Sequence, residues 1–69
     1  MEIIKLRDTS IKLGQALKTA GFAESGVDAK YAILDGKVKV NGQTVTQRGK
    51  KLTDGDLVDY QGQTIKIVK

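Results

Sequence analysis

One stretch near the middle of the chain restricts the possible folds more than any other. Charged and apolar residues alternate along Lys37–Val40, the pattern of a half-buried strand, and Asn41-Gly42 follows directly. Asn-Gly is the pair best suited to a two-residue type I′ turn, because both residues tolerate positive φ. We therefore expect a tight hairpin in which Val40 lies opposite Gln43 and the valine side faces the helices.

A short helix that ends at Leu34 is expected just before the hairpin. Ser25 is a suitable N-cap, Asp28 stands three residues later as in a capping box, and Gly36 is placed to end the helix in a left-handed conformation. Two lines of apolar residues make most of the helix circumference apolar, so we expect it to be sandwiched between an earlier helix and a sheet. These residues are Val27, Ala29, Tyr31, Ala32, Ile33 and Leu34.

The first third of the chain predicts a strand followed by a helix. Glu2–Leu6 is rich in apolar residues and reads as the strand, and the polar segment Arg7–Ser10 offers several N-caps for the helix. Gly21 ends that helix, and Phe22 is placed to pack back on its last turn. The helix is predicted from apolar residues at the spacing of one helix face, namely Leu13, Ala16, Leu17 and Ala20.

A second hairpin is expected at the end of the chain. Leu57–Tyr60 and Thr64–Val68 read as strands around Gln61-Gly62, with Leu57, Ile65 and Ile67 as core residues, and the last strand is placed to pair with the first one. The elements together predict an α+β fold, with two short helices packed on a small, mostly antiparallel sheet of four to five strands. No repeat or composition shift divides the chain, which we interpret as a single domain over residues 1–69.

Several classes of function are disfavoured by what the sequence lacks. The 69 residues include no cysteine and no histidine, so a disulfide framework or a typical zinc site is not expected. Catalysis would need serine with lysine, or a carboxylate pair, and Asp54 and Asp56 flank a turn glycine that explains them as well. No apolar run is long enough to span a membrane, and the chain is expected to be a cytoplasmic protein.

Positive charge gathers in one part of the chain. The net charge is +4, but Ala29–Thr53 holds six basic residues and one acid, Asp35, which favours a polyanionic partner. Within it, Arg48-Gly49-Lys50-Lys51 is a basic loop in which arginine can bind a phosphate through two hydrogen bonds and glycine allows a close approach. The six basic residues are Lys30, Lys37, Lys39, Arg48, Lys50 and Lys51.

A plainer interpretation of the same lysines stays open. Lys37 and Lys39 are expected on the hairpin face that points away from the helices, beside Thr44 and Thr46. Lysines at such positions also serve to discourage the pairing of sheet edges, without any ligand. Lys30 is expected to point toward the same surface as Lys37.

These residues together resemble the S4 RNA-binding domain, in its stand-alone small bacterial form. The family signature runs from the start of the second helix through Gly-x-Val-x-Val-Asn-Gly to Gly-Asp, and the resemblance covers Leu13–Val58. It implies an S4-like fold with an αL motif, in which two helices and the following hairpin form an RNA-binding surface. The matching residues are Gly36, Val38, Val40, Asn41, Gly42, Gly55 and Asp56.

The resemblance also implies which residues contact RNA. Carried over by position, the start of the second helix around Ser25 meets the phosphate backbone. Many family members have arginine at the next position, where this chain has Gly26, and acidic Asp28 follows. This departure shifts the expected contacts toward Lys30 and the basic loop, and fewer phosphate contacts mean weaker binding. The expected RNA-binding residues are Ser25, Lys30, Lys37, Lys39, Arg48, Lys50 and Lys51.

The expected function is therefore non-enzymatic binding of structured RNA, either ribosomal or transfer RNA, by a monomeric protein that associates with the ribosome. No cofactor, metal or small-molecule substrate is expected. The few aromatic residues, two tyrosines and one phenylalanine, do not favour base-specific recognition. Two alternatives remain: an adaptor that docks on an acidic partner in a ribosomal or DNA-maintenance complex, and a general nucleic-acid binder that also takes DNA.

Overall fold

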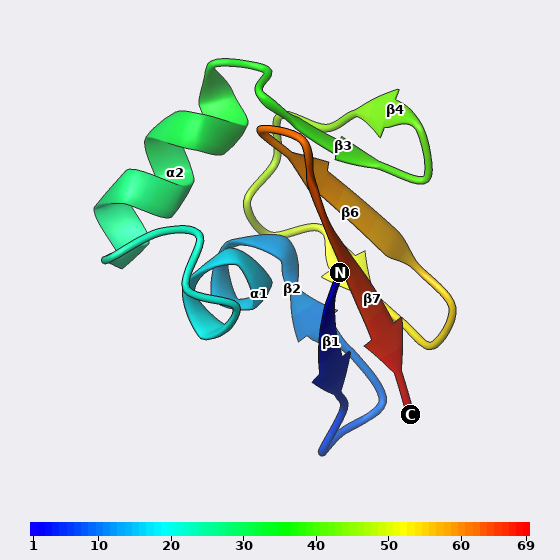
Figure 1. Ribbon diagram of the computed structural model, residues 1–69. Helices are drawn as coiled ribbons and strands as arrows, with labels where there is room; N and C mark the ends of the chain where they lie inside the picture. The colour runs from blue at the N-terminus through cyan, green and yellow to red at the C-terminus, as the bar shows by residue number, and fades with distance from the viewer.

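Two helices cover one face of a five-stranded sheet in the computed structural model, which describes residues 1–69 (Figure 1). A separate two-stranded ladder joins the segment before the first helix to the segment before the second hairpin. The strands and helices in chain order are β1 Glu2–Lys5, β2 Ile11–Lys12, α1 Leu13–Thr19, α2 Gly26–Leu34, β3 Val38–Val40, β4 Gln43–Thr44, β5 Lys51–Leu52, β6 Leu57–Tyr60 and β7 Gln63–Val68.

The main sheet has the order β1-β7-β6-β3-β4, with every neighbouring pair antiparallel except β1 and β7. The predicted α+β fold with a mostly antiparallel sheet is therefore confirmed. The predicted pairing of the first and last strands is also confirmed, and it is parallel, with Glu2 opposite Ile65 and Lys5 opposite Val68. The sheet stays open, because β1 and β4 lie at its two edges.

Both hairpins have the predicted turns. Asn41 and Gly42 have φ values of 52° and 84°, and Val40 lies opposite Gln43 as the type I′ turn requires. The β6–β7 hairpin repeats this geometry at Gln61 and Gly62, with φ values of 50° and 77°. The two turns fix the register of both hairpins, and therefore which side chains reach the core.

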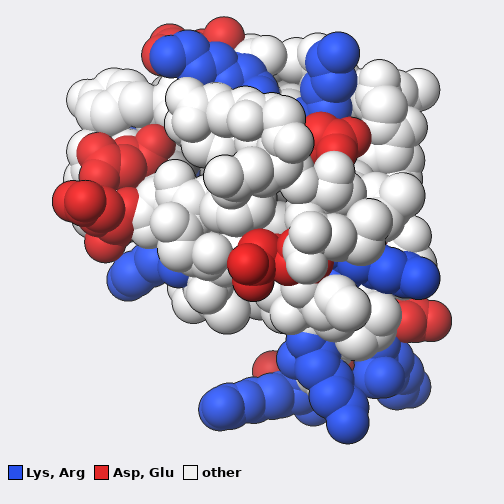
Figure 2. All heavy atoms as spheres, viewed as in Figure 1, with Lys and Arg blue, Asp and Glu red and all other residues white.

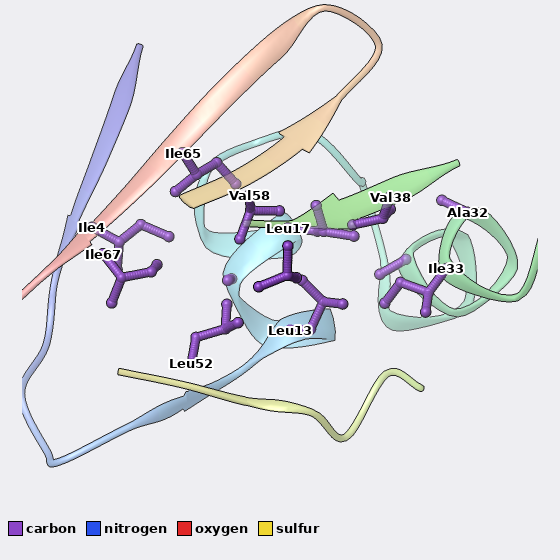
Figure 3. Close-up of a cluster of buried hydrophobic side chains, with 13 residues drawn as sticks. Ile4, Leu13, Leu17, Ala32, Ile33, Val38, Leu52, Val58, Ile65 and Ile67 are labelled. Atoms are coloured by element: carbon purple, nitrogen blue, oxygen red, sulfur yellow. The ribbon is translucent and has the colours of Figure 1, made fainter. Parts of the chain in front are cut away.

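The core lies between the helices and the sheet, and Figure 3 shows its side chains pointing toward one another from both layers. The predicted core residues Ile65 and Ile67 are fully buried, but Leu57 is not. Strand alternation places Val58 inward and leaves Leu57 37% exposed on the other face. The buried residues are Ile4, Leu13, Ala16, Leu17, Ala29, Ala32, Ile33, Val38, Val40, Leu52, Val58, Ile65 and Ile67.

The expectation that α2 is sandwiched on most of its circumference is wrong. The side chains of Ala29, Ala32 and Ile33 are buried, whereas the line Val27, Tyr31 and Leu34 points to solvent. At about 100° of rotation per residue these two lines lie on opposite sides of the helix. The helix packs against α1 and the core with one side only (Figure 1), so its second apolar line has nothing to cover it.

Candidate nucleic-acid interface

The basic loop between β4 and β5 is attached to the start of α1 by backbone hydrogen bonds. The amide of Leu13 donates to the carbonyl of Lys50 at 2.8 Å, and the amide of Gly14 donates to the carbonyl of Arg48 at 3.0 Å. These carbonyls accept from two of the amides that a helix start leaves unpaired. The loop is thus held by its backbone, and its basic side chains are exposed to solvent.

This arrangement replaces the side-chain N-cap expected within Arg7–Ser10. The N-cap residue is Lys12, which makes no capping hydrogen bond with its side chain. The helix starts later than expected because Ile11 and Lys12 form strand β2, which pairs with β5. The chain therefore satisfies the start of α1 with carbonyls from a segment far away in sequence, which local patterns cannot reveal.

The β2–β5 ladder places two lysines directly opposite each other. Ile11 pairs with Leu52, which is fully buried, and Lys12 pairs with Lys51 on the exposed side. Like charges opposite each other in a ladder are unfavourable by roughly 0.2–1 kcal/mol relative to a neutral pair. A bound anion between the two ammonium groups removes this repulsion, so the pair is suited to a phosphate.

A shallow depression beside this ladder is lined by residues of three segments, and every charged residue around it is basic. It brings the start of α1 and its following turn together with the basic loop and the first residue of α2. None of the residues around it is acidic or apolar. They are Lys12, Gly14, Gln15, Lys18, Gly26, Arg48 and Gly49. We call Lys12, Lys18, Arg48 and Lys51 the basic face.

Lys12 and Lys18 were not among the residues expected from the sequence. They precede the segment in which positive charge is concentrated, and no local pattern connects them to the basic loop. The available signal is that Lys18 and Gln15 occupy the polar side of α1, opposite Leu13 and Leu17. That the loop packs against this end of α1 follows only from the fold.

The start of α2 borders the basic face as the resemblance implies. Ser25 is the N-cap, and its hydroxyl accepts a hydrogen bond from the amide of Asp28 at 3.2 Å. The first helical hydrogen bond runs from Ala29 to the carbonyl of Ser25, which leaves the amides of Gly26 and Val27 ahead of it. Apart from its chain neighbours and the backbone of its own helix, nothing lies within 4 Å of where a Cβ on Gly26 would stand, so this position has room for a side chain.

The remaining expected lysines are spread over different surfaces. Lys30 is exposed one turn after Gly26 on the same side of α2, and therefore extends the border of the basic face. Lys37 does not share its surface, contrary to expectation: it lines a depression with Glu24, Asp28 and Asp35. The cause is that α2 ends at Leu34 and the chain turns at Gly36, so helical spacing no longer applies.

Lys39 and Lys50 also have acidic neighbours. Lys39 is exposed beside Thr44, as expected, and its partner on the other strand is Asp59. Lys50 lines a depression under the β3–β4 hairpin, and its charge acts on Asp56. The structure thus brings Arg48 together with the start of α2, places Lys51 opposite Lys12, and leaves Lys37, Lys39 and Lys50 outside that group.

A side-chain clasp joins the first hairpin turn to the turn before β6. The Asn41 amide nitrogen donates to Asp56 at 2.9 Å, and the Asn41 amide oxygen accepts from the amide of Leu57 at 3.0 Å. The second oxygen of Asp56 accepts from the amide of Thr53 at 2.8 Å. The hydrogen bonds from Thr53 and Asn41, together with the charge of Lys50, lower the pKa of Asp56. We call these contacts the Asn41–Asp56 clasp.

The clasp explains why Val-Asn-Gly and Gly-Asp occur together in the sequence, because the two motifs are bonded to each other. The neighbouring Asp54 has a structural contact as well, since its carboxylate accepts from the amide of Lys69 at 2.9 Å. Of the two carboxylates considered for catalysis, Asp56 therefore joins two turns and Asp54 binds the backbone just after β7. No group of three possible metal ligands occurs in the structure, and neither helix is long and apolar enough to cross a membrane.

Comparisons with known proteins identify relatives of this fold. A family model described as S4 domain matches residues 4–68. YbcJ of Escherichia coli (strain K12), named as a candidate RNA-binding protein, is 38% identical over 58 residues, which cover 84% of this chain and 83% of YbcJ. RlbA of Bacillus subtilis (strain 168), named as a candidate ribosome maturation protein, is 39% identical over 59 residues, covering 86% of this chain and 83% of RlbA.

The comparison of structures leads to the same relative. The solution structure of YbcJ from E. coli, described as revealing an αL motif involved in RNA binding, superposes with a TM-score of 0.77. The match has 34% sequence identity and covers 100% of this chain and 89% of that one. The predicted S4-like fold with its αL motif is therefore confirmed.

Proposed function

This chain belongs to the S4 domain family, and we propose that it is a non-enzymatic protein that binds structured RNA, ribosomal or transfer RNA, with its basic face. The observation that carries the proposal is the gathering of Lys12, Lys18 and Arg48 around the start of α2, in a depression without an acidic residue. Ser25 and Lys30 border this face and extend the contact along α2.

The physical basis is neutralisation of the RNA backbone. Each phosphate contacted by lysine or arginine releases counterions, so about four contacts give a salt dependence of roughly the third to fourth power. The backbone hydrogen bonds from α1 hold the basic loop in place before RNA arrives. Binding therefore does not require the loop backbone to become ordered, which lowers the entropic cost of association.

Recognition by shape is favoured over recognition of bases. Phe22 and Tyr60 are partly buried and pack on each other with ring centroids 6.3 Å apart, so they do not form an open stacking platform. Tyr31 is exposed, but it stands on the outer side of α2 and does not line the basic depression. The name of the relative RlbA supports ribosomal RNA as the first target to test.

A charge-reversal pair tests the proposal. Arg48→Glu places a negative charge in the basic face, whereas Lys66→Glu makes the same change in net charge on the exposed side of β7. We expect Arg48→Glu to weaken binding to protein-free ribosomal RNA about tenfold or more, and Lys66→Glu to weaken it by less than about threefold. The measurement is a filter-binding or fluorescence titration at several salt concentrations, with folding checked by circular dichroism.

Two outcomes would contradict the proposal. Equal losses for the two variants would mean that net charge alone binds RNA and that the basic face has no special role. Unlabelled duplex DNA that competes as well as structured RNA would favour a general nucleic-acid binder. We expect duplex DNA to compete poorly, because the spacing of phosphates across the grooves differs between the two kinds of helix.

A further inference from the structure

The outer side of α2 carries an exposed apolar line. Val27 and Tyr31 are each 59% exposed and Leu34 is 52% exposed, at positions i, i+4 and i+7 of one helix face. Single exposed apolar residues are common on protein surfaces. Here three of the six large exposed apolar residues of the chain lie in one line on a nine-residue helix.

The two borders of this line have opposite charge. Asp28 and Asp35 lie on one side of the helix, and with Glu24 they surround a depression that also contains Tyr31 and Lys37. Figure 2 shows acidic side chains gathered on the α2 side of the molecule. Gly26 and Lys30 lie on the opposite border, next to the basic face. The apolar line therefore separates an acidic surface from the surface assigned to RNA.

We propose that this outer side of α2 is a docking site for a second protein, one that is itself bound to the same RNA and presents an apolar patch flanked by lysine or arginine. We call the residues Glu24, Val27, Asp28, Tyr31, Leu34 and Asp35 the acidic–apolar face. The proposal rests on the proposed RNA-binding function, because RNA brings the two proteins together.

The charge of the acidic–apolar face favours a basic protein over RNA as its partner. The three carboxylates of the acidic–apolar face outnumber the one lysine of the same depression, Lys37, so this surface disfavours a phosphate backbone as the partner that covers the apolar line. Proteins bound to RNA carry clusters of lysine and arginine, because the phosphate backbone demands them. Their exposed cationic residues complement Glu24, Asp28 and Asp35, while apolar contacts cover Tyr31 and Leu34.

The acidic–apolar face is small, which limits how tightly it can bind a partner by itself. A single face of a nine-residue helix is smaller than the surface buried in stable complexes, so its contact with a free partner is weak. When both proteins are bound to the same RNA, the contact between them becomes intramolecular. The high effective concentration then raises the overall affinity of this chain for the ribonucleoprotein. The docking site should therefore contribute to binding of assembled ribonucleoprotein and contribute nothing to binding of protein-free RNA.

The test compares purified ribosomal subunits with protein-free RNA extracted from the same subunits. The variant Tyr31→Ser/Leu34→Ser removes two of the three side chains of the apolar line, and the control Ile3→Ser removes another exposed apolar side chain, 63% exposed on β1. We expect the double variant to bind subunits about tenfold more weakly and to bind the extracted RNA within about twofold of wild type. Ile3→Ser should change neither affinity.

A charge variant at Asp35 should change the affinity for extracted RNA and the affinity for subunits in opposite directions. Asp35 is the exposed C-cap of α2, where a cation is compatible with the helix dipole. We expect Asp35→Lys to bind extracted RNA equally or slightly more tightly, because it adds positive charge, and to bind subunits more weakly. A purely electrostatic interaction of the whole molecule with RNA would instead strengthen both.

A photocrosslinker placed at Tyr31 identifies what the face touches in the subunit complex. Crosslinks to a ribosomal protein through a basic segment support the proposal, and crosslinks to RNA overturn it. The proposal is also overturned if the double variant loses affinity for both subunits and extracted RNA, or for neither. Wild-type protein that binds subunits but not extracted RNA would overturn the proposed function, and with it the statement that RNA brings the two proteins together. Loss of subunit binding in the double variant would then still locate a protein contact on this face. Wild type that binds neither would overturn both proposals.

Discussion

The turns joined by the Asn41–Asp56 clasp and the basic loop lie in the same half of the chain, but different parts of their residues hold them in place. In the clasp, side chains make the hydrogen bonds that join two turns. In the basic loop, backbone carbonyls make the attachment to α1, and the side chains of Arg48 and Lys51 are exposed. Side chains engaged in holding the fold have little freedom to bind a ligand. The motif residues Asn41 and Asp56 therefore stabilise the fold, whereas the exposed side chains of the loop are free to bind a ligand, as proposed above.

The strongest test of this division is to remove the clasp. Asn41→Ala deletes hydrogen bonds to Asp56 and Leu57, and we expect the free energy of unfolding to fall by about 2–3 kcal/mol, since one of the partners is charged. Gln61→Ala is the matched control, because Gln61 has the same positive φ in the other hairpin and no side-chain hydrogen bond holding another turn. Urea unfolding measures both.

The affinity of the folded variants for RNA gives the second half of this test. We expect it to stay within about twofold of wild type for both substitutions, because neither residue belongs to the basic face. A large loss of RNA affinity in well-folded Asn41→Ala would show that the clasp also binds the ligand, and the division between the two regions would fail.

The second test exploits the lysine pair of the β2–β5 ladder. Lys12→Gln removes one of two opposed charges, so we expect unfolding to cost about 0.2–1 kcal/mol more than in wild type. The same change should weaken RNA binding severalfold and reduce the salt exponent by about one, because one phosphate contact is lost. Lys66→Gln is the control. Lower stability in Lys12→Gln would contradict the inference that the two opposed lysines repel each other in the absence of a ligand.

The third test introduces the arginine that the resemblance to the S4 family implies for many members at the start of α2. Gly26→Arg adds a cation at the edge of the basic face, where nothing lies within 4 Å of the new Cβ. We expect RNA affinity to rise about threefold and the salt exponent to increase by about one. Gly26→Gln, of similar length without the charge, separates the effect of charge from that of helix propensity. Unchanged affinity would place the RNA away from this helix end.

The smallest effect concerns pH. The pKa of Asp56 is lower in the folded protein than its ordinary value of 3.8, so its contribution to stability is present at neutral pH and is lost as pH falls through the folded pKa. We expect thermal melts of wild type and Asp56→Asn to differ most at neutral pH and to converge below about pH 4. A difference that stays constant with pH would mean that the charge of Asp56 plays no part in the clasp.

Most of the fold could be predicted because it depends on local signals. Asn41-Gly42 and Gly36 adopt the positive φ values expected of them, and Ser25 caps α2. The β2–β5 ladder could not be predicted, because strands of two residues leave no periodic pattern. The exposed line of α2 was missed for another reason: apolar spacing shows that residues share a face, but not whether a neighbour covers it.

The candidate site was only partly foreseeable. The charge of the basic loop is visible in the sequence, and so is the start of α2. Lys12 and Lys18 join it through a backbone attachment between Gly14 and Arg48, which depends on the tertiary fold. The RNA-binding roles of all these residues remain predictions until the variants above are measured.

The parallel pairing of β1 with β7 has a consequence for how the molecule assembles. Glu2 pairs with Ile65, so every residue of the basic face lies inside the loop that this pairing closes. Closing so long a loop costs entropy that only the finished core can compensate. We expect β1 to dock last during folding and to detach first under native conditions. The helix α1, the basic loop and the β2–β5 ladder, which carry the proposed binding surface, then form ahead of it, and hydrogen exchange should be faster in β1 than in β6.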